Sequence, residues 1–367
     1  MKDVKVVMLH SGRVQVASIR LTRMLSSTRF YSLALAVIST AVVTCPAMAQ
    51  YKVLQTAKVG GDGGFDYVAA DSDTRRLYVA RSGAGSALHV FNLDTLAPVG
   101  DVATGSSHGA AIDSTLHHGF ATSKPVTMFD TESLQVIKTI DTGGNPDGYL
   151  ADTVEHKVYI LSHSAPQVTV LDAHDGNIIG HVALDGAPEQ SVLDGKGHLY
   201  IDLEDKDAIA VVDTKTYAVT ATYDIHSAGG GCAGLAIDRK NGILFASCRD
   251  KSNMIILSAA TGKIITSLPT GAGSDGAVFN PATMEAFSSQ GDGTLTIVKE
   301  NAPTSFVVEQ TVKTPVRAKT LTLDTKTNRI YLITAEFGPA PAPAAPGARP
   351  ARPPMIPGTF SIVVVGK

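Results

Sequence analysis

Residues 69–80 read Ala-Ala-Asp-Ser-Asp-Thr-Arg-Arg-Leu-Tyr-Val-Ala and open a unit that recurs seven times along the chain. In each copy a short polar residue is followed, six or seven positions later, by an aromatic residue within an apolar run. The polar positions are Asp71, Asp113, Asp152, Asp194, Asp238, Asn280 and Asp324. The aromatic positions are Tyr78, Phe120, Tyr159, Tyr200, Phe245, Phe287 and Tyr331. Successive copies lie 39 to 44 residues apart, which indicates one structural unit repeated at nearly constant length.

Each copy continues with further short runs rich in Val and Ile, such as Val136–Ile140 and Val168–Asp172, bounded by turn-forming residues. Four short antiparallel strands in a repeat of about 42 residues are typical of one blade of a propeller. The sequence therefore predicts an all-β fold, a seven-bladed β-propeller with four antiparallel strands per blade. We expect each polar residue to cap the first hairpin turn of its blade. We expect each aromatic to be buried between blades, the alternative being a binding platform.

Closure of the ring follows from the two ends of the repeat. The seventh unit stops after its third strand, Phe360–Val365, while the stretch Tyr51–Val59 precedes the first unit and belongs to no copy. The N-terminal strand is therefore predicted to complete the last blade and to leave no open sheet edge between the ends of the ring.

These motifs resemble the YVTN-type, YncE-like family of seven-bladed propellers. The matching phrases are Leu77–Ala80, Val158–Leu161, Pro146–Gly148 and the Asp-Thr turns at Asp130 and Asp213. The resemblance extends over residues 50–367 and implies an exported propeller. It says little about activity, although related propellers include bacterial lactonases, which by analogy raises the possibility of an enzyme.

Residues 1–49 are predicted to be a signal peptide rather than part of the fold. Arginines at 20, 23 and 29 precede an apolar run, Tyr31–Thr44, that is too short to span a bilayer, and Ala47-Met48-Ala49 forms a cleavage site. Translation from Met1 or from Met24 gives such a signal. We therefore expect a periplasmic or secreted protein with one propeller domain, residues 50–367, and no membrane span after cleavage.

The charge of that domain argues against a nucleic-acid partner. Residues 50–367 hold 25 Lys and Arg against 33 Asp and Glu, a net charge of −8, with no basic run to follow a phosphate backbone. Two cysteines remain, Cys232 and Cys248, at the two ends of a predicted hairpin. An even number in an exported chain favours a disulfide between them, with metal binding or a reactive thiol as the lesser alternative.

A ring of polar residues is expected where the first strands of the blades begin, around one mouth of the central channel. These positions, five before each repeat residue, are Asp66, His108, Asp147, Glu189, Ala233, Asp275 and Lys319. The second strands end at the same face, near Arg81, His163, Glu204 and Arg249. One interpretation is purely structural, with strand-capping groups that meet water in the channel. The other is a site for a small polar ligand.

We predict that the protein is a binding or scaffold module for a small polar ligand or an envelope protein, and a monomer. No cofactor is predicted, although His108, Asp147 and Asp275 offer ligands for a divalent cation. The alternative is a hydrolase or lyase at the same mouth. Its general base would be His108 or His163, assisted by the carboxyl groups of the ring, Asp147, Glu189 and Asp275. Arg81 or Arg249 would then hold an anionic substrate.

The seventh unit departs from the repeat between its second and third strands. The insertion, residues 338–358, is rich in proline and alanine and is expected to favour extended conformations over regular hydrogen-bonded structure. Its place in the blade puts it at the same face as the ring. It is interpreted either as a shield or docking element at the channel mouth, or as a disordered excursion.

Overall fold

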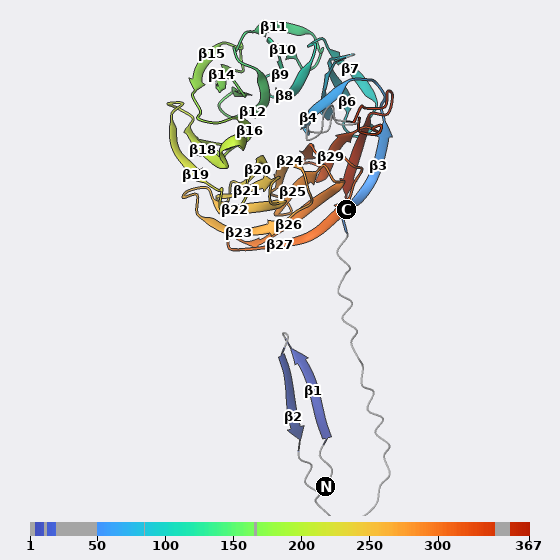
Figure 1. Cartoon of the computed structure of the whole chain (residues 1–367), viewed down its shortest axis with the longest axis vertical. Helices are drawn as coiled ribbons and strands as arrows, with labels where there is room; N and C mark the ends of the chain where they lie inside the picture. Colours follow the sequence, from blue (N-terminus) through green and yellow to red (C-terminus); the bar gives the residue numbers. More distant parts are fainter. Residues whose placement is uncertain (1–3, 11–12, 20–49, 84, 165–166, 342–352) are drawn as a thin grey trace, which may run out of the picture. The chain divides into compact units, whose positions relative to one another are not determined.

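The computed structural model describes residues 4–10, 13–19, 50–83, 85–164, 167–341 and 353–367. The chain divides into two compact units, residues 1–48 and 49–367. In the second unit seven four-stranded antiparallel sheets surround a central axis (Figure 1). The predicted seven-bladed β-propeller is thus confirmed. No helix among the described residues is long and apolar enough to cross a membrane.

The strands of the first four blades follow the order of the sequence. The first blade is β4 (Gly64–Asp71), β5 (Arg76–Ser82), β6 (Leu88–Asn92) and β7 (Pro98–Val102). The second is β8 (Ser107–Asp113), β9 (His118–Ser123), β10 (Val126–Asp130) and β11 (Val136–Ile140). The third is β12 (Pro146–Asp152), β13 (Lys157–Ser162), β14 (Val168–Asp172) and β15 (Ile178–Val182). The fourth is β16 (Pro188–Leu193), β17 (His198–Leu203), β18 (Ala208–Asp213) and β19 (Val219–Asp224), with a 3-10 turn, η1 (Glu204–Lys206).

The remaining three blades include the one that closes the ring. The fifth blade is β20 (Cys232–Asp238), β21 (Ile243–Cys248), β22 (Asn253–Ser258) and β23 (Ile264–Pro269). The sixth is β24 (Ser274–Asn280), β25 (Glu285–Gln290), β26 (Thr294–Ala302) and β27 (Ser305–Lys313). The seventh is β28 (Leu321–Asp324), β29 (Arg329–Thr334), β30 (Ser361–Gly366) and β3 (Lys52–Lys58).

The first unit contains a separate hairpin of β1 (Val4–His10) and β2 (Arg13–Ile19), which the sequence did not predict. The apolar run 31–44 and the cleavage site 47–49 of the predicted signal peptide lie outside the described residues. The signal peptide therefore stays a prediction.

The N-terminal strand closes the ring as predicted. Strand β3 pairs antiparallel with β30, from Lys52 opposite Gly366 to Lys58 opposite Ser361, and lies beside the C-terminal strands in Figure 1. Side chains reinforce this backbone pairing. The buried Tyr51 donates its hydroxyl to Glu285 Oε2 at 2.5 Å, and Lys367 Nζ lies 2.9 Å from Glu285 Oε1. The two ends of the propeller unit therefore meet on one carboxylate of the sixth blade.

The repeated polar residues cap the first hairpin turns. In all seven blades the side-chain oxygen accepts the backbone N–H two residues further on, at 2.6–3.1 Å. Three of them also link neighbouring blades, and one of these is Asn280, whose amide donates to Asn328 Oδ1 of the seventh blade at 2.9 Å. Asp324 of the seventh blade accepts both terminal nitrogens of Arg75 from the first blade, each at 2.8 Å, and Asp113 accepts His156 Nδ1 of the third blade at 2.7 Å. The cap and the link between blades thus use the same side chain.

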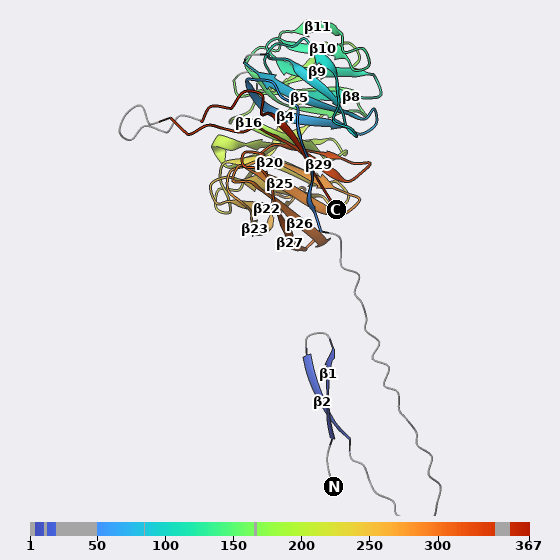
Figure 2. The ribbon, with the colours of Figure 1, turned by 90° about the vertical axis from the view of Figure 1, so that its right-hand side faces the viewer.

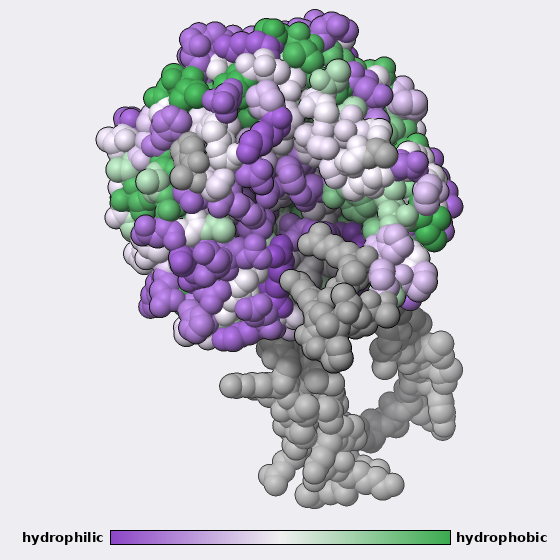
Figure 3. Space-filling model, turned by 45° about the horizontal axis from the view of Figure 1, so that its top comes forward, coloured by the Kyte–Doolittle hydropathy of each residue, from purple (hydrophilic) through white to green (hydrophobic). Residues whose placement is uncertain are grey.

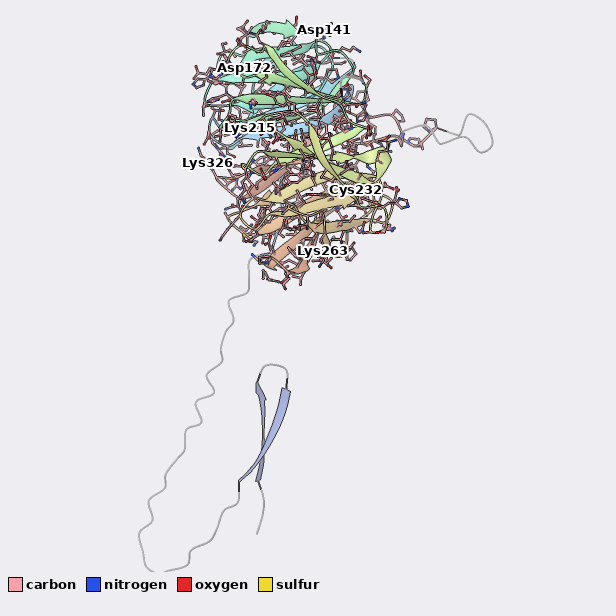
Figure 4. All side chains as sticks on the ribbon, turned by 90° about the vertical axis from the view of Figure 1, so that its left-hand side faces the viewer. Asp141, Asp172, Lys215, Cys232, Lys263 and Lys326 are labelled. Carbon is pink, nitrogen blue, oxygen red and sulfur yellow. A yellow bond between two sulfur atoms is a disulfide. The ribbon has the colours of Figure 1, made fainter. Side chains whose placement is uncertain are left out.

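The seven repeat aromatics are all buried, none being more than 3% exposed, as expected of packing residues rather than a binding platform. The predicted disulfide is also confirmed, because Cys232 and Cys248 face each other across β20 and β21 and are bonded. Cys232 lies on the side of the disc from which the insertion projects, whereas Lys215 and Lys326, in hairpin turns, lie on the opposite side (Figure 4). Strand starts and first hairpin turns therefore occupy opposite faces.

Replacing Tyr51 by alanine is expected to destabilise the propeller by about 3–5 kcal/mol, because the change leaves a cavity beside Phe287 and removes a hydrogen bond from the buried Glu285. Urea unfolding measures the loss. Leu54→Ala is the control, since Leu54 lies on the adjoining strand β3 but is 39% exposed, and it should cost less than about 1 kcal/mol. Equal losses in the two variants would show that Tyr51 does not fasten the ring.

Asp324 makes the stability of the ring depend on pH. Burial raises the pKa of this carboxyl, but hydrogen bonds from Arg75 and Thr327 outweigh burial and hold it at about 2. A lowered pKa stabilises the fold above the unfolded-state value of about 4, and this stabilisation is lost as the pH falls from about 4 towards 2. Wild type should therefore lose about 2 kcal/mol more than Asp324→Asn over that range. Parallel curves of unfolding free energy against pH would contradict this role.

Candidate functional site

In six of the seven blades a β-bulge lies at the ring position. In the first six blades the pairing of the first two strands skips the ring position, as between Phe65 and Val68 in β4 and between Cys232 and Gly234 in β20. A bulged residue is left out of the ladder and its side chain is aimed away from the regular alternation. Six equivalent bulges therefore bring side chains from six blades to one mouth, where hydrophilic residues gather around the central hollow (Figure 3).

Glycines beside the ring residues let the strands approach each other. A Cβ atom at Gly109 would lie 2.0 Å from Cε1 of Tyr149, and one at Gly148 would lie 2.6 Å from the backbone oxygen of Glu189. Real Cβ atoms do not approach that closely, so only glycine fits at these two positions. Glycine at both positions therefore allows close packing of the strands at the axis.

One half of the mouth combines histidines with carboxylates. His108 Nδ1 lies 2.9 Å from Asp66 Oδ2 and 3.4 Å from Asp147 Oδ1, so that three adjacent blades converge on this nitrogen. His163 Nε2 lies 3.4 Å from Asp147 Oδ2 and 3.7 Å from Glu189 Oε1. Asp66, His108 and Asp147 each offer one ligand atom, and these atoms all lie within 4.8 Å of one another.

The other half of the mouth is internally neutralised. Arg249, at the end of the second strand of the fifth blade, forms ion pairs with both Glu204 and Asp275, and Lys319 pairs with the second oxygen of Asp275. Asp275 is therefore bound by two cations and is not part of the histidine cluster. Of the three predicted metal ligands, the structure brings His108 and Asp147 together, with Asp66 in the place expected for Asp275.

The electrostatics follow from this division. Five carboxyl groups face two permanent cations at the mouth, namely Asp66, Asp147, Glu189, Glu204 and Asp275 against Arg249 and Lys319. Burial and the charge of Asp66 raise the pKa of Asp147, while burial and the neighbouring Glu204 raise the pKa of Glu189 to about 9. The hydrogen bond to Asp66 raises the pKa of His108. Protons thus gather where the negative charge is in excess, and a cation would be attracted there.

Side chains that cross the axis close the channel beneath the mouth. The rings of Tyr67, in the first blade, and Tyr149, in the third, meet edge to face with centroids 5.7 Å apart. Gln190 of the fourth blade accepts the N–H of Ala277 in the sixth at 3.0 Å and donates to its carbonyl at 2.9 Å. These blades are not neighbours, so both contacts span the channel. The site is therefore a cup whose floor is formed by these side chains. Tyr67 also joins the floor to the ring, because its hydroxyl donates a hydrogen bond to Glu189 at 3.2 Å.

Arg81 is buried in the packing of the first and seventh blades and does not join the ionisable groups of the mouth. It is 3% exposed, its guanidinium lies 4.0 Å from the centroid of Phe360, and its N–H groups donate to the backbone oxygens of residues 60, 62 and 64. Backbone oxygens therefore already accept the N–H groups with which Arg81 was predicted to hold an anionic ligand. Arg249 does lie at the mouth, but paired with acids.

The sequence did not single out Tyr67, Tyr149 or Gln190, which form the floor. The only signal for them is position, since Tyr67 and Gln190 directly follow ring residues and Tyr149 follows an Asp-Gly pair. Among the described residues, no serine hydroxyl or cysteine thiol is hydrogen-bonded to His108 or His163. The hydrolase or lyase alternative stays a prediction.

Comparison with solved structures supports the fold class, a seven-bladed β-propeller. The chain aligns with a structure titled mitotic checkpoint complex over 85% of its length (TM-score 0.66, 13% identity, 95% of that chain). It also aligns with the WD40 repeats of RRP9 over 88% (TM-score 0.67, 10% identity, 99% of that chain) and with U3-55K over 87% (TM-score 0.66, 10% identity, 99% of that chain). Identities this low show the shared fold alone.

Comparison with curated sequences finds two relatives of the chain. Two proteins described as uncharacterized protein YncE, from Salmonella typhi and Salmonella typhimurium, are each 27% identical over 194 residues, which is 50% of this chain and 54% of theirs. The chain thus spans about half the length of the curated relatives it matches. No family model matches the sequence. Together with the seven blades, these relatives confirm the predicted resemblance to YncE-like propellers.

Proposed function

We propose that the protein is a binding module that holds a divalent metal ion at the channel mouth, on Asp66, His108 and Asp147. The observation that carries the proposal is the convergence of two carboxylates on one imidazole, with ligand atoms within 4.8 Å from three adjacent blades. The excess of carboxylates over cations at the mouth supports a positively charged occupant. A propeller with YncE relatives is in general terms a binding or scaffold module.

The donor set favours a transition metal over calcium. Imidazole together with carboxylates suits Zn²⁺ or Mn²⁺, whereas Ca²⁺ is bound by oxygen ligands alone and in larger number. Three protein ligands leave coordination positions open, as in zinc sites that also bind a small molecule. His108 and Asp66 have side chains 43% and 32% exposed, so an oxygen of a polar ligand can reach an ion held between them. The small polar ligand would then bind through the metal.

We also propose that the protein acts outside the cytoplasm. The Cys232–Cys248 disulfide supports this, because such bonds persist in oxidising compartments, and so do the features of a signal peptide in residues 1–49. The proposal covers the periplasm of a bacterial cell or the medium.

Mass spectrometry of the purified protein from cell envelope and cytoplasmic fractions checks the location. The chain should be found in the envelope or medium, beginning at Gln50, with a mass two hydrogens below that of the dithiol. A cytoplasmic chain that retains residues 1–49 and has free thiols would overturn the proposal of export.

Calorimetric titration with Zn²⁺, Mn²⁺ and Ca²⁺ tests the metal site. Wild type should bind one equivalent of Zn²⁺ or Mn²⁺ more tightly than Ca²⁺. His108→Ala and Asp147→Asn should each weaken Zn²⁺ binding by at least about tenfold, since each removes one ligand.

The matched control is His89→Ala, which removes a histidine that is also paired with a carboxylate, Asp101 Oδ1 at 2.7 Å, but that lies on the third strand of the first blade. Zn²⁺ affinity should not change in this variant. If His108→Ala and Asp147→Asn bind Zn²⁺ as wild type does, the ion is not held at the mouth and the proposed function fails.

A further inference from the structure

A second pocket, of about 410 Å³, lies beside the ring and is distinct from the histidine cluster. Phe65, Phe337 and Met355 supply its apolar walls, together with prolines of the insertion. Its ionisable lining groups are two cations, Arg317 and Lys319, and one acid, Asp62. Volumes of this order and a mostly apolar lining with a few polar groups are typical of small-molecule sites.

The pocket exists only because of the insertion in the seventh blade. Elsewhere the second and third strands are joined closely, as from Ser123 to Val126, whereas in this blade β29 ends at Thr334 and β30 begins at Ser361. The described ends of the insertion leave one face of the disc side by side (Figure 2). They pair with each other through a bridge between Phe337 and Met355.

The aromatic wall is fixed by the core beneath it. Phe65 lies 5.1 Å from Phe360 and 6.4 Å from Phe337, measured between ring centroids. Phe360 is fully buried and is covered by Arg81, whose guanidinium is held by backbone oxygens. The wall is therefore preorganised, which reduces the entropy lost when a ligand binds.

The cationic edge comes mainly from Arg317. Its guanidinium lies over the ring of Phe337, 4.5 Å from the centroid, and it forms no ion pair within the described part of the chain. A guanidinium stacked on an aromatic ring keeps the N–H groups at its edge for a carboxylate, sulfonate or phosphate. Lys319 adds a second positive charge, although it shares that charge with Asp275 of the ring.

We infer that this pocket binds a small organic anion, with an apolar or aromatic body against Phe65, Phe337 and Met355 and an acidic head group on Arg317. The site is separate from the proposed metal site and takes an occupant of opposite charge. Phe65 directly precedes Asp66, so the two sites adjoin along β4. The proposal does not depend on a metal ion at the mouth.

Two fluorescent probes of similar shape test the inference in buffer with EDTA, which keeps metal ions away from the mouth. Anilinonaphthalene sulfonate is an aromatic anion, and N-phenylnaphthylamine is its neutral counterpart. Wild type should bind one equivalent of the sulfonate, saturably, and about tenfold more tightly than the neutral probe. Arg317→Gln should lose that preference with little change for the neutral probe, and Phe337→Ser should weaken both.

Lys215→Gln is the matched control, because it removes one exposed positive charge on the opposite face of the disc, and both probes should bind it as they bind wild type (Figure 4). If Phe337→Ser does not fold, as judged by its unfolding curve, Arg317→Gln alone decides. Equal affinity of wild type for the two probes, or unchanged sulfonate binding in Arg317→Gln, would overturn the assignment of an anion site.

Discussion

The pairing of β3 with β30 is the interaction on which the rest of the structure depends. Each blade packs mainly against its two neighbours, so an unclosed ring would expose two sheet edges and let the first and seventh blades move apart. Backbone hydrogen bonds between residues 52–58 and 361–366 remove that freedom. Tyr51 and Lys367 then converge on Glu285, and Arg75 joins the same two blades through Asp324. A closed ring holds all seven strand starts at constant positions around the axis, and a site built from several blades requires this.

The functional mouth arises from small, repeated departures from regular β structure. In six blades a bulge at the ring position aims one side chain inwards, and glycine at positions such as 109 and 148 removes the Cβ atoms that would block the approach of the next strand. Charge then divides the mouth into two parts. Asp275 is neutralised by Arg249 and Lys319, whereas the ion pairs of Asp66 and Asp147 within the described part of the chain are with His108 and His163. The first part is an internally satisfied network, and the second is where a cation gains most.

Much of the fold was readable from the sequence because the repeat carries it. The capping residues and buried aromatics recur once per blade, the leftover N-terminal strand predicted the closure, and the two cysteines fall opposite each other in one hairpin. The positions of the ring residues could be predicted from the repeat, but the directions of their side chains could not. Those directions depend on the bulges, and a bulge depends on backbone pairing that no single residue specifies. For the same reason Asp275 was grouped with His108. Arg81 was grouped with the ligand contacts because its burial against Phe360 depends on packing between segments far apart in the sequence, which the repeat does not specify. The floor of Tyr67, Tyr149 and Gln190 joins blades that are not neighbours, so no local pattern could reveal it.

The most direct test of the central claim is anomalous diffraction at the zinc edge from crystals of the propeller grown with one equivalent of Zn²⁺. The account predicts a single strong peak at the mouth, about 2.0–2.3 Å from His108 Nδ1 and from one carboxylate oxygen of Asp66 and of Asp147. It also predicts no peak of comparable height at the other two histidine–carboxylate pairs described above, His156 with Asp113 and His89 with Asp101. Absence of a peak at the mouth, or a stronger one elsewhere on the disc, would contradict it.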